Sequence, residues 1–286
     1  MKFLFDENEP GAVTIIKPKW RNSVVVPARW IFLLSLLMAG CATIVQPPSM
    51  LVTGNEDISD ELALRSWAQV LESSVDWRGR VDFHNLEKNS VPLQIYLSYI
   101  AEVSPEKNPE KFPTLDSQLA YFINSYNALA MVGIFAHDFP EDFHGLWDRA
   151  KFFKFTRFKI GGKEISLYDF ENDVIRPLGD PRIHFALNCM VRACPRLPQT
   201  PFHAENLDAT LDMLTREFVN HSGHVQVLET AGLVRLSEIF RFYEEDFVNP
   251  KTASSLIAYI NRYRDKPIDE NLNVEFIAYD WTVNYQ

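Results

Sequence analysis

Residues 115–137 read LDSQLAYFINSYNALAMVGIFAH, and this stretch decides the fold. Apolar side chains fall on nearly every face of the helix that the spacing predicts, so we expect a central helix buried on all sides. Two amides, Asn124 and Asn127, lie three residues apart and share one face of that helix. A buried amide costs free energy unless it is hydrogen-bonded. We therefore expect these side chains either to hold loop backbone, for example around Asp180 and Pro181, or to line a polar pocket.

The segments on either side alternate between helical and strand-like patterns. Apolar periodicity predicts further helices over residues 61–74, 92–103, 207–219, 236–248 and 254–263, with Asp60 as the cap of the first. Alternation and turn residues predict a short strand or turn over 81–85, a hairpin over 159–167 with Gly161-Gly162 at its turn, a strand over 182–188, and an extended segment over 276–284. The expected fold class is α+β: one helix-rich domain over residues 61–286, with a small, mainly antiparallel sheet and a central buried helix.

Residues 1–40 have the features of a targeting segment. The uncharged run WIFLLSLLMAG at 30–40 follows Arg29 and is shorter than the roughly 20 residues that a membrane-spanning helix needs. A basic flank, a short apolar core and a small-residue end are typical of a secretory signal peptide. The final Met38-Ala39-Gly40-Cys41 resembles the bacterial lipobox, which implies a lipoprotein-type signal peptide and lipidation of Cys41.

The lipid on Cys41 would anchor the chain to a membrane through a tether, residues 41–60. This segment contains Pro47-Pro48 and shows no helical or strand period. Ala42 stands where an inner-membrane retention signal usually has aspartate, so the same resemblance implies the outer membrane, with the domain facing the periplasm.

The chain carries 28 basic and 38 acidic residues, a net charge of −10. A surface this negative repels nucleic acid and anionic lipid headgroups, so we expect no nucleic-acid partner. The expected membrane contact is the lipid anchor at Cys41, and the remaining partner would be an envelope protein, a peptide or a glycan.

Four motifs follow one another through the globular part. They are YFINSYNALAM at 121–131, IGGKEISLYDFENDVIRP at 160–177, DPRIHFALNCMVRACPRL at 180–197 and YDWTVNY at 279–285. Together they resemble the DUF547 family, a bacterial and plant domain of unknown function, over roughly residues 64–285. The resemblance therefore implies no established activity. Asn172 stands where the family pattern has histidine, so no imidazole chemistry is expected there.

Two cysteines remain in the globular part, Cys189 and Cys194. In an exported protein such a pair most often forms a disulfide, and closing so small a loop stabilises the fold by about 2 kcal/mol. The alternatives are two free buried thiols, or a catalytic or redox thiol with Cys189 as nucleophile and His184 as base. In the last case Arg192 or Arg196 would be the positive neighbour that lowers the pKa of the thiol. In the predicted strand His184 and Asn188 share one face, and Asn188 or Asn124 would then serve as the oxyanion or orienting group.

Three charged residues precede this segment. Arg176 lies between Glu171 and Asp180, which favours a partly buried ion network that also lines the pocket of the two helix asparagines. The functional alternative is that Asp180 orients His184, four residues further on, as the third member of a triad-like relay.

Two functions stay open. The first is a membrane-tethered binding or scaffold module with a disulfide-pinned loop and a polar pocket. The second is a thiol-dependent hydrolase or acyltransferase of the envelope that uses Cys189 and His184. No phosphate-binding glycine loop and no G-x-S-x-G or H-E-x-x-H motif occurs, and no second histidine lies at ligand spacing near the cysteines, so neither a cofactor nor a metal is expected.

Overall fold

A computed structural model of the chain describes residues 44–45 and 58–286. The expected signal peptide, Cys41 and most of the expected tether lie outside these residues. Within them the protein is rich in helices and has two small sheets, which confirms the α+β class.

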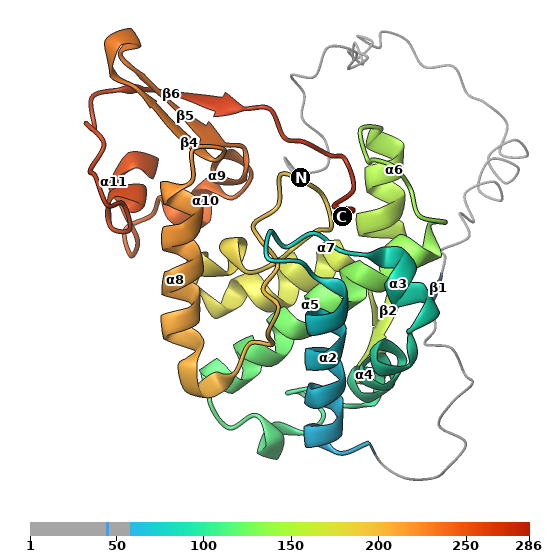
Figure 1. The fold of residues 1–286 in the computed structure, drawn as a ribbon. Coiled ribbons are helices and arrows are strands. Elements are labelled where there is room, and N and C mark those ends of the chain that lie inside the picture. The colour runs from blue at the N-terminus through green and yellow to red at the C-terminus, as the bar shows by residue number, and fades with distance from the viewer. Residues whose placement is uncertain (1–43, 46–57) are drawn as a thin grey trace, which may run out of the picture.

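The predicted central helix is α5 (Leu115–Ala136), which runs through the middle of the molecule (Figure 1). Its start is capped reciprocally: the Thr114 hydroxyl accepts the Ser117 N–H, and the Ser117 hydroxyl accepts the Thr114 N–H. By length and composition α5 is the one helix of the described residues that could cross a membrane, but 89% of its most apolar window is buried inside the protein. That burial is typical of a core helix.

Three other long helices confirm segments expected from the sequence: α2 (Asp60–Ser74), α4 (Val91–Glu102) and α8 (Leu207–Asn220). The shorter helices are α3 (Phe83–Lys88), α6 (Leu146–Ala150), α7 (Leu167–Asp169), α9 (Ile239–Phe242), α10 (Glu244–Phe247) and α11 (Leu256–Asn261). Single turns of 3-10 or π geometry are η1 (Pro109–Lys111), η2 (Lys151–Phe155), η3 (Phe170–Ile175), η4 (Arg176–Leu178), η5 (Pro181–Phe185), η6 (Ala204–Asn206) and η7 (Glu229–Ala231).

The strands form two separate three-stranded sheets. In the first, β1 (Ile44–Val45) pairs in parallel with β2 (Arg157–Ile160), which forms the predicted hairpin with β3 (Lys163–Ile165). In the second, β4 (Val225–Leu228) and β5 (Leu233–Ser237) are antiparallel, and β6 (Asn273–Ile277) adds to β5 in parallel. Figure 1 shows this second sheet at one end of the molecule, beside α9, α10 and α11.

Several local expectations were wrong. The cap of α2 is Ser59, whose hydroxyl oxygen accepts the N–H of Leu62 at 3.2 Å, whereas Asp60 is already helical. The segment at 81–85 holds one bridge residue and then the start of α3, because the Asp82 carboxylate accepts the Asn85 N–H and caps a helix. The helix expected over 236–248 begins as the end of β5 and continues as α9 and α10.

The strand expected over 182–188 is also wrong. Residues 181–185 form the 3-10 turn η5, since Pro181 occupies its first position and the Asp180 carboxylate accepts the Arg182 N–H at 2.9 Å. His184 and Asn188 therefore do not share the face of a strand. The consequence is a different set of neighbours for His184.

The C-terminal segment closes the fold. Leaving β6, it crosses back over the molecule (Figure 1) and pairs with three distant segments through the bridges Asp142–Thr282, Val191–Val283 and Val81–Tyr285. Trp281 is buried, and the Arg149 guanidinium lies 4.5 Å from the centre of its ring. This closure brings residues near 80, 190 and 280 into one neighbourhood.

Candidate functional site

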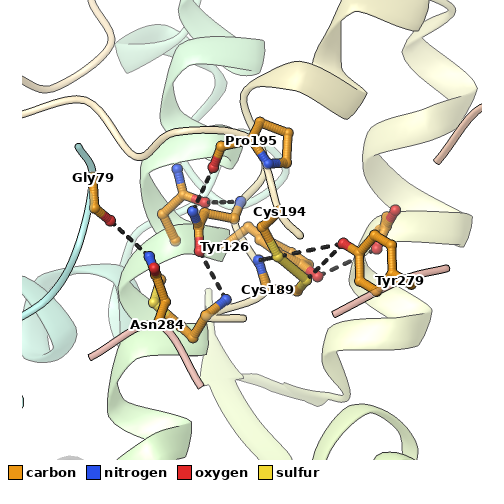
Figure 2. The surroundings of a disulfide bond; sticks show 11 residues. Gly79, Tyr126, Cys189, Cys194, Pro195, Tyr279 and Asn284 are labelled. Carbon is orange, nitrogen blue, oxygen red and sulfur yellow. Dashed lines mark hydrogen bonds between the residues drawn. A yellow bond between two sulfur atoms is a disulfide. The ribbon is translucent and has the colours of Figure 1, made fainter. Parts of the chain in front are cut away.

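The centre of that neighbourhood is a disulfide between Cys189 and Cys194 (Figure 2). Asn188 shapes the short loop between them: its side-chain oxygen accepts the Met190 N–H at 2.8 Å, and its amide nitrogen donates to the Pro195 carbonyl at 2.7 Å. Met190 takes a φ of 62°, an uncommon conformation for a residue with a Cβ. Of the alternatives for the two cysteines, the structure has the disulfide. While the disulfide is intact, Cys189 cannot act as a nucleophile. Both polar atoms of the Asn188 side chain are hydrogen-bonded to loop backbone, so neither is free to act as the expected oxyanion or orienting group.

The asparagines of α5 hold loop backbone in place. Asn127 donates to the Ala186 carbonyl at 3.0 Å and accepts the Asn188 N–H at 2.8 Å. Asn124 binds the N–H and carbonyl of Phe202 at 2.9 and 2.8 Å and also accepts the indole N–H of Trp67. Of the two expectations for these asparagines, the structure has the first: both hold loop backbone, and we call this contact the clamp. The backbone that they hold is at residues 186–188 and 202, not at Asp180-Pro181. Neither asparagine lines the cavities described next.

A cleft of about 600 Å³ opens on the Cys194 side of the disulfide. Its charged lining consists of four arginines against two carboxylates, and the remaining walls are mostly apolar or aromatic. The charged residues are Arg78, Arg80, Arg192, Arg196, Glu217 and Asp280. The cleft is thus positive although the chain has a net charge of −10, and a positive cleft attracts anionic ligands.

The arginines of this cleft differ in how they are held. Arg196 forms an ion pair with Glu217 through two nitrogens, one of them 2.7 Å from the carboxylate. Arg80 donates to the side-chain oxygen of Asn284 at 2.8 Å, and the Asn284 amide nitrogen donates in turn to the Gly79 carbonyl. Gly79 has a φ of +77°, and a Cβ there would lie 2.6 Å from the Leu197 nitrogen, so only glycine fits.

Arg192 is exposed and has no side-chain hydrogen bond or ion pair within the described part of the chain. Partial burial and the nearby charge of Arg192 both lower the pKa of Arg80. Burial raises the pKa of Asp280, but hydrogen bonds from Thr282 and the charge of Arg192 outweigh it, so this pKa is lowered and the carboxylate stays charged. The charges of Asp76 and Asp280 raise the pKa of Arg80 but do not outweigh burial and the charge of Arg192, so the pKa of Arg80 stays lowered.

The cleft also has aromatic walls. Trp77 is 71% exposed, and the Arg78 guanidinium lies 4.7 Å from its ring centre, so a flat apolar face stands at the rim. His224, also part of the lining, stacks on Phe218 with ring centres 3.9 Å apart. Burial, together with the neighbouring His221, lowers the pKa of His224 to about 4, so this ring adds no charge at neutral pH.

A second, much smaller cavity of about 20 Å³ lies on the Cys189 side of the disulfide. It has room for about one water molecule. Its polar lining comprises Glu171, His184 and the phenols Tyr126, Tyr243 and Tyr279. Tyr126 donates to the Glu171 carboxylate at 3.3 Å, and burial first, then the charge of Glu171, raises the pKa of all three tyrosines, so the phenols remain protonated donors.

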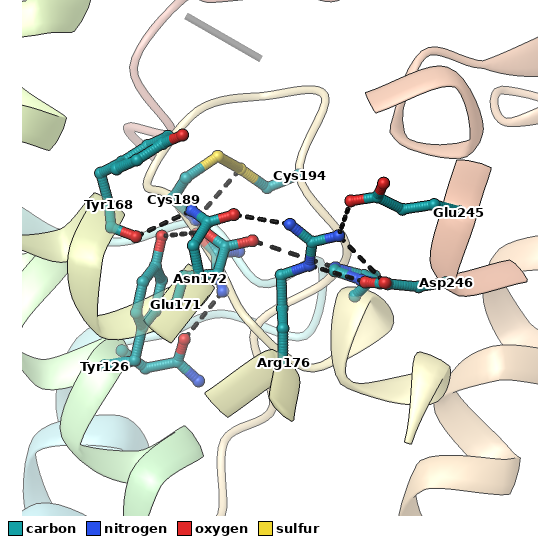
Figure 3. Close-up of polar contacts among 12 residues, drawn as sticks. Tyr126, Tyr168, Glu171, Asn172, Arg176, Cys189, Cys194, Glu245 and Asp246 are labelled. Carbon is teal, nitrogen blue, oxygen red and sulfur yellow. Dashed lines mark hydrogen bonds and ion pairs between the residues drawn. A yellow bond between two sulfur atoms is a disulfide. The ribbon is translucent and has the colours of Figure 1, made fainter. Parts of the chain in front are cut away.

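Two acidic side chains flank His184, and Figure 3 shows most of this network. His184 Nε2 donates to the Asp246 carboxylate at 2.7 Å, whereas Nδ1 is buried without a hydrogen bond, 3.9 Å from Glu171 Oε1. Burial raises the pKa of Asp246, but hydrogen bonds from His184 and Arg176 outweigh it and lower the value to about 2. The imidazole is thus oriented by Asp246, and the relay expected through Asp180 is wrong because Asp180 binds Arg182.

Arg176 does belong to a partly buried ion network, as expected, but its partners come from α10. It donates to Asp246 at 2.7 and 2.9 Å and to Glu245 at 2.7 Å, and it also binds the Asn172 side-chain oxygen at 2.6 Å. Neither of the carboxylates that flank it in the sequence is hydrogen-bonded to it. Asn172 thus accepts a hydrogen bond from Arg176 through its side-chain oxygen.

The site therefore has two halves joined by the disulfide and by Tyr279, whose hydroxyl lies 3.5 Å from both sulfur atoms. Sequence reasoning found Glu171, His184 and the cysteines. It named Arg192 and Arg196 only as positive neighbours of Cys189, and it missed Arg78, Arg80 and Asp246, which no local motif marks. Among the described residues, no group of three or more histidine, cysteine or acidic side chains is arranged to hold a metal ion.

Comparison with known families gives one match, over residues 111–219, to the model described as "Protein of unknown function, DUF547". The matched segment runs from just before α5 to near the end of α8 and includes the disulfide, Arg192, Arg196 and the inner cavity's Glu171 and His184. Neither the search of curated proteins nor that of solved structures gave a match.

Proposed function

We propose that this protein is a binding module of the cell envelope and that it holds a small anionic ligand in the arginine cleft. Residues 111–219, which match the DUF547 model, supply part of that cleft. The ligand class is a sugar or peptide that carries a phosphate or carboxylate group. The lipobox-like Met38 to Cys41 supports a membrane anchor, and Ala42 supports an outer-membrane location facing the periplasm.

One observation carries the proposal: Arg80 and Arg192 lie close enough to affect each other, and Arg192 has no ion-pair partner in the described part of the chain. Like charges held together cost free energy, and an anion between them removes that cost and gains charge-assisted hydrogen bonds. Arg196 is already neutralised by Glu217, so it contributes less.

The surroundings add selectivity. Trp77 offers an exposed ring at the rim, on which the face of a sugar or the side chain of a peptide would pack. Glu217 and Asp280 would repel a ligand that carries several unshielded negative groups. The cleft therefore favours a molecule with one anionic group and a neutral or apolar body.

Isothermal titration of the full chain tests this with matched ligands: a hexose monophosphate against the free hexose, and a short peptide against its C-terminally amidated form. We expect binding of an anionic member only, and Arg192→Ala should weaken it about tenfold or more, since a hydrogen bond to a charged group contributes about 1.5–3 kcal/mol. Arg235→Ala is the control, because Arg235 on β5 pairs with Glu275 on β6, and neither residue lines the cleft. Equal binding of charged and neutral members, or equal effects of the two substitutions, would refute the proposal.

A further inference from the structure

The two sulfur atoms of the disulfide face different spaces. Cys194 lines the arginine cleft, whereas Cys189 lines the small inner cavity with Glu171 and His184. Both residues are buried, with 6% of Cys194 and 7% of Cys189 exposed, but only the cleft on the Cys194 side, about 600 Å³ against about 20 Å³, has room for a substrate beside the bond. A disulfide whose only role is to stabilise a loop does not need a sulfur atom that lines a large cleft.

Hydrogen-bond donors point at the sulfurs. The Cys189 backbone N–H donates to Cys194 Sγ at 3.2 Å, and the Tyr279 hydroxyl lies 3.5 Å from both Sγ atoms. Donors of this kind stabilise a thiolate more than a thiol or a disulfide, and so does the charge of Arg192, which lines the same cleft as Cys194. The site is thus arranged for a negative charge on Cys194 once the bond is broken.

We propose that Cys189 and Cys194 are a redox-active pair that oxidises a dithiol substrate in the arginine cleft, with Cys194 as the sulfur that is attacked and Cys189 as the buried leaving group. This activity goes beyond anion binding and does not depend on it.

The exchange proceeds in two displacements. A substrate thiol loses its proton to solvent, and its thiolate forms a bond to Cys194 Sγ while the Cys189–Cys194 bond breaks. The released electron pair stays on Cys189 Sγ, which takes a proton from solvent. The second substrate thiolate then attacks the first substrate sulfur and releases Cys194 as a thiolate. The substrate gains a disulfide and loses two protons to solvent, while the protein pair gains two electrons and, on Cys189, one proton, with Cys194 left as a thiolate.

The arginine cleft suits the first displacement. Its guanidinium groups attract the attacking thiolate, and Arg192 is free to approach it. Tyr279, which touches both sulfurs, is a positioning residue that supports the charge on Cys194 after the second displacement.

The test uses the full chain carrying Cys41→Ser in detergent, so that the pair is the only source of thiols. In this background Cys189→Ser leaves Cys194 free, and Cys194→Ser leaves Cys189 free. We expect the thiol of the Cys189→Ser chain to react with iodoacetamide at neutral pH at least about tenfold faster than that of the Cys194→Ser chain. Equal rates, or a faster Cys189, would overturn the assignment of roles.

Activity is tested on the chain with both cysteines present. The dithiol is the N-acetylated synthetic peptide Gly-Cys-Gly-Gly-Cys, whose one negative group is its C-terminal carboxylate. We expect one peptide disulfide formed per protein disulfide lost, under conditions where circular dichroism shows an intact fold. In the Cys189→Ser background the peptide should be trapped on Cys194 when it is supplied as a mixed disulfide with thionitrobenzoate. A protein disulfide that stays intact until urea unfolds the chain would identify a purely structural bond and refute the proposal.

Tyr279→Phe separates positioning from packing. In the Cys189→Ser background it should lower the ultraviolet thiolate absorbance of Cys194 and slow its alkylation, with the melting temperature of the chain little changed. Unchanged absorbance would exclude the hydroxyl from this role.

Discussion

Replacement of Asn127 by alanine tests the account of how α5 supports the site. Asn127 is buried and makes two hydrogen bonds, one to the Ala186 carbonyl and one from the Asn188 N–H, immediately before the disulfide loop. Within the described residues, no other hydrogen bond reaches either backbone group. Alanine would leave both groups buried and unpaired.

The expected magnitude follows from these two orphaned groups. Each buried polar group without a partner costs about 1–3 kcal/mol, so Asn127→Ala should lower the free energy of unfolding by about 4 kcal/mol. Urea unfolding followed by circular dichroism measures this directly. Asn89→Ala is the matched control, because Asn89 is exposed and bonds only to Asn85 one turn earlier, and its cost should stay below about 1 kcal/mol. Similar losses in the two variants would refute the clamp.

Three further changes test other parts of the structure. The chain should lose free energy of unfolding between pH 7 and pH 4, because His224 takes up a proton near pH 6.5 when unfolded but only near pH 4 when folded. His224→Phe should make this loss smaller by about 2–3 kcal/mol. Urea unfolding at both pH values measures the difference, and an unchanged loss would contradict the pKa argument. Asp246→Asn should cost about 2–3 kcal/mol of unfolding free energy at pH 7, since it removes an ionised partner of His184, and a cost below about 1 kcal/mol would mean that the network is not stabilising. Trp77→Ala should weaken anion binding about threefold or more in calorimetry and leave urea stability within about 0.5 kcal/mol, because the ring is 71% exposed; a large loss of stability would assign Trp77 to packing instead.

The sequence predicted the elements whose pattern is long or chemically marked. The helix α5 has 22 residues of nearly continuous apolar character, and the β2–β3 hairpin has its Gly161-Gly162 turn. The buried asparagines of α5, Asn124 and Asn127, were expected to need hydrogen-bond partners, and both bind loop backbone. A pattern of this length leaves little room for another structure.

Short alternating segments were less decisive. Residues 182–188 alternate like a strand, but Asp180-Pro181 before them is the cap and first residue of a 3-10 turn. This local signal could have been recognised, since proline at the first helical position is common. The helix expected over 236–248 is instead the end of β5 followed by α9 and α10. Its first residues, Leu236 and Ser237, are in a strand because they pair with β6, which lies far along the chain.

The arginine cleft could not be predicted from local patterns. Arg80 and Arg192 are more than 100 residues apart in sequence and meet only because the C-terminal segment pairs near both of them. Asp246 likewise reaches His184 across 62 residues, whereas the carboxylate closest in sequence, Asp180, is occupied by Arg182. Long-range closure decides these contacts, and sequence spacing does not report it.

The most direct test of the anion-binding account is a crystal structure of the full chain with the tightest ligand from the titration panel. The account predicts that the phosphate or carboxylate group lies within about 3 Å of the Arg192 guanidinium, with the ligand body toward Trp77. A ligand bound elsewhere, with Arg80 and Arg192 left without an anion between them, would contradict it.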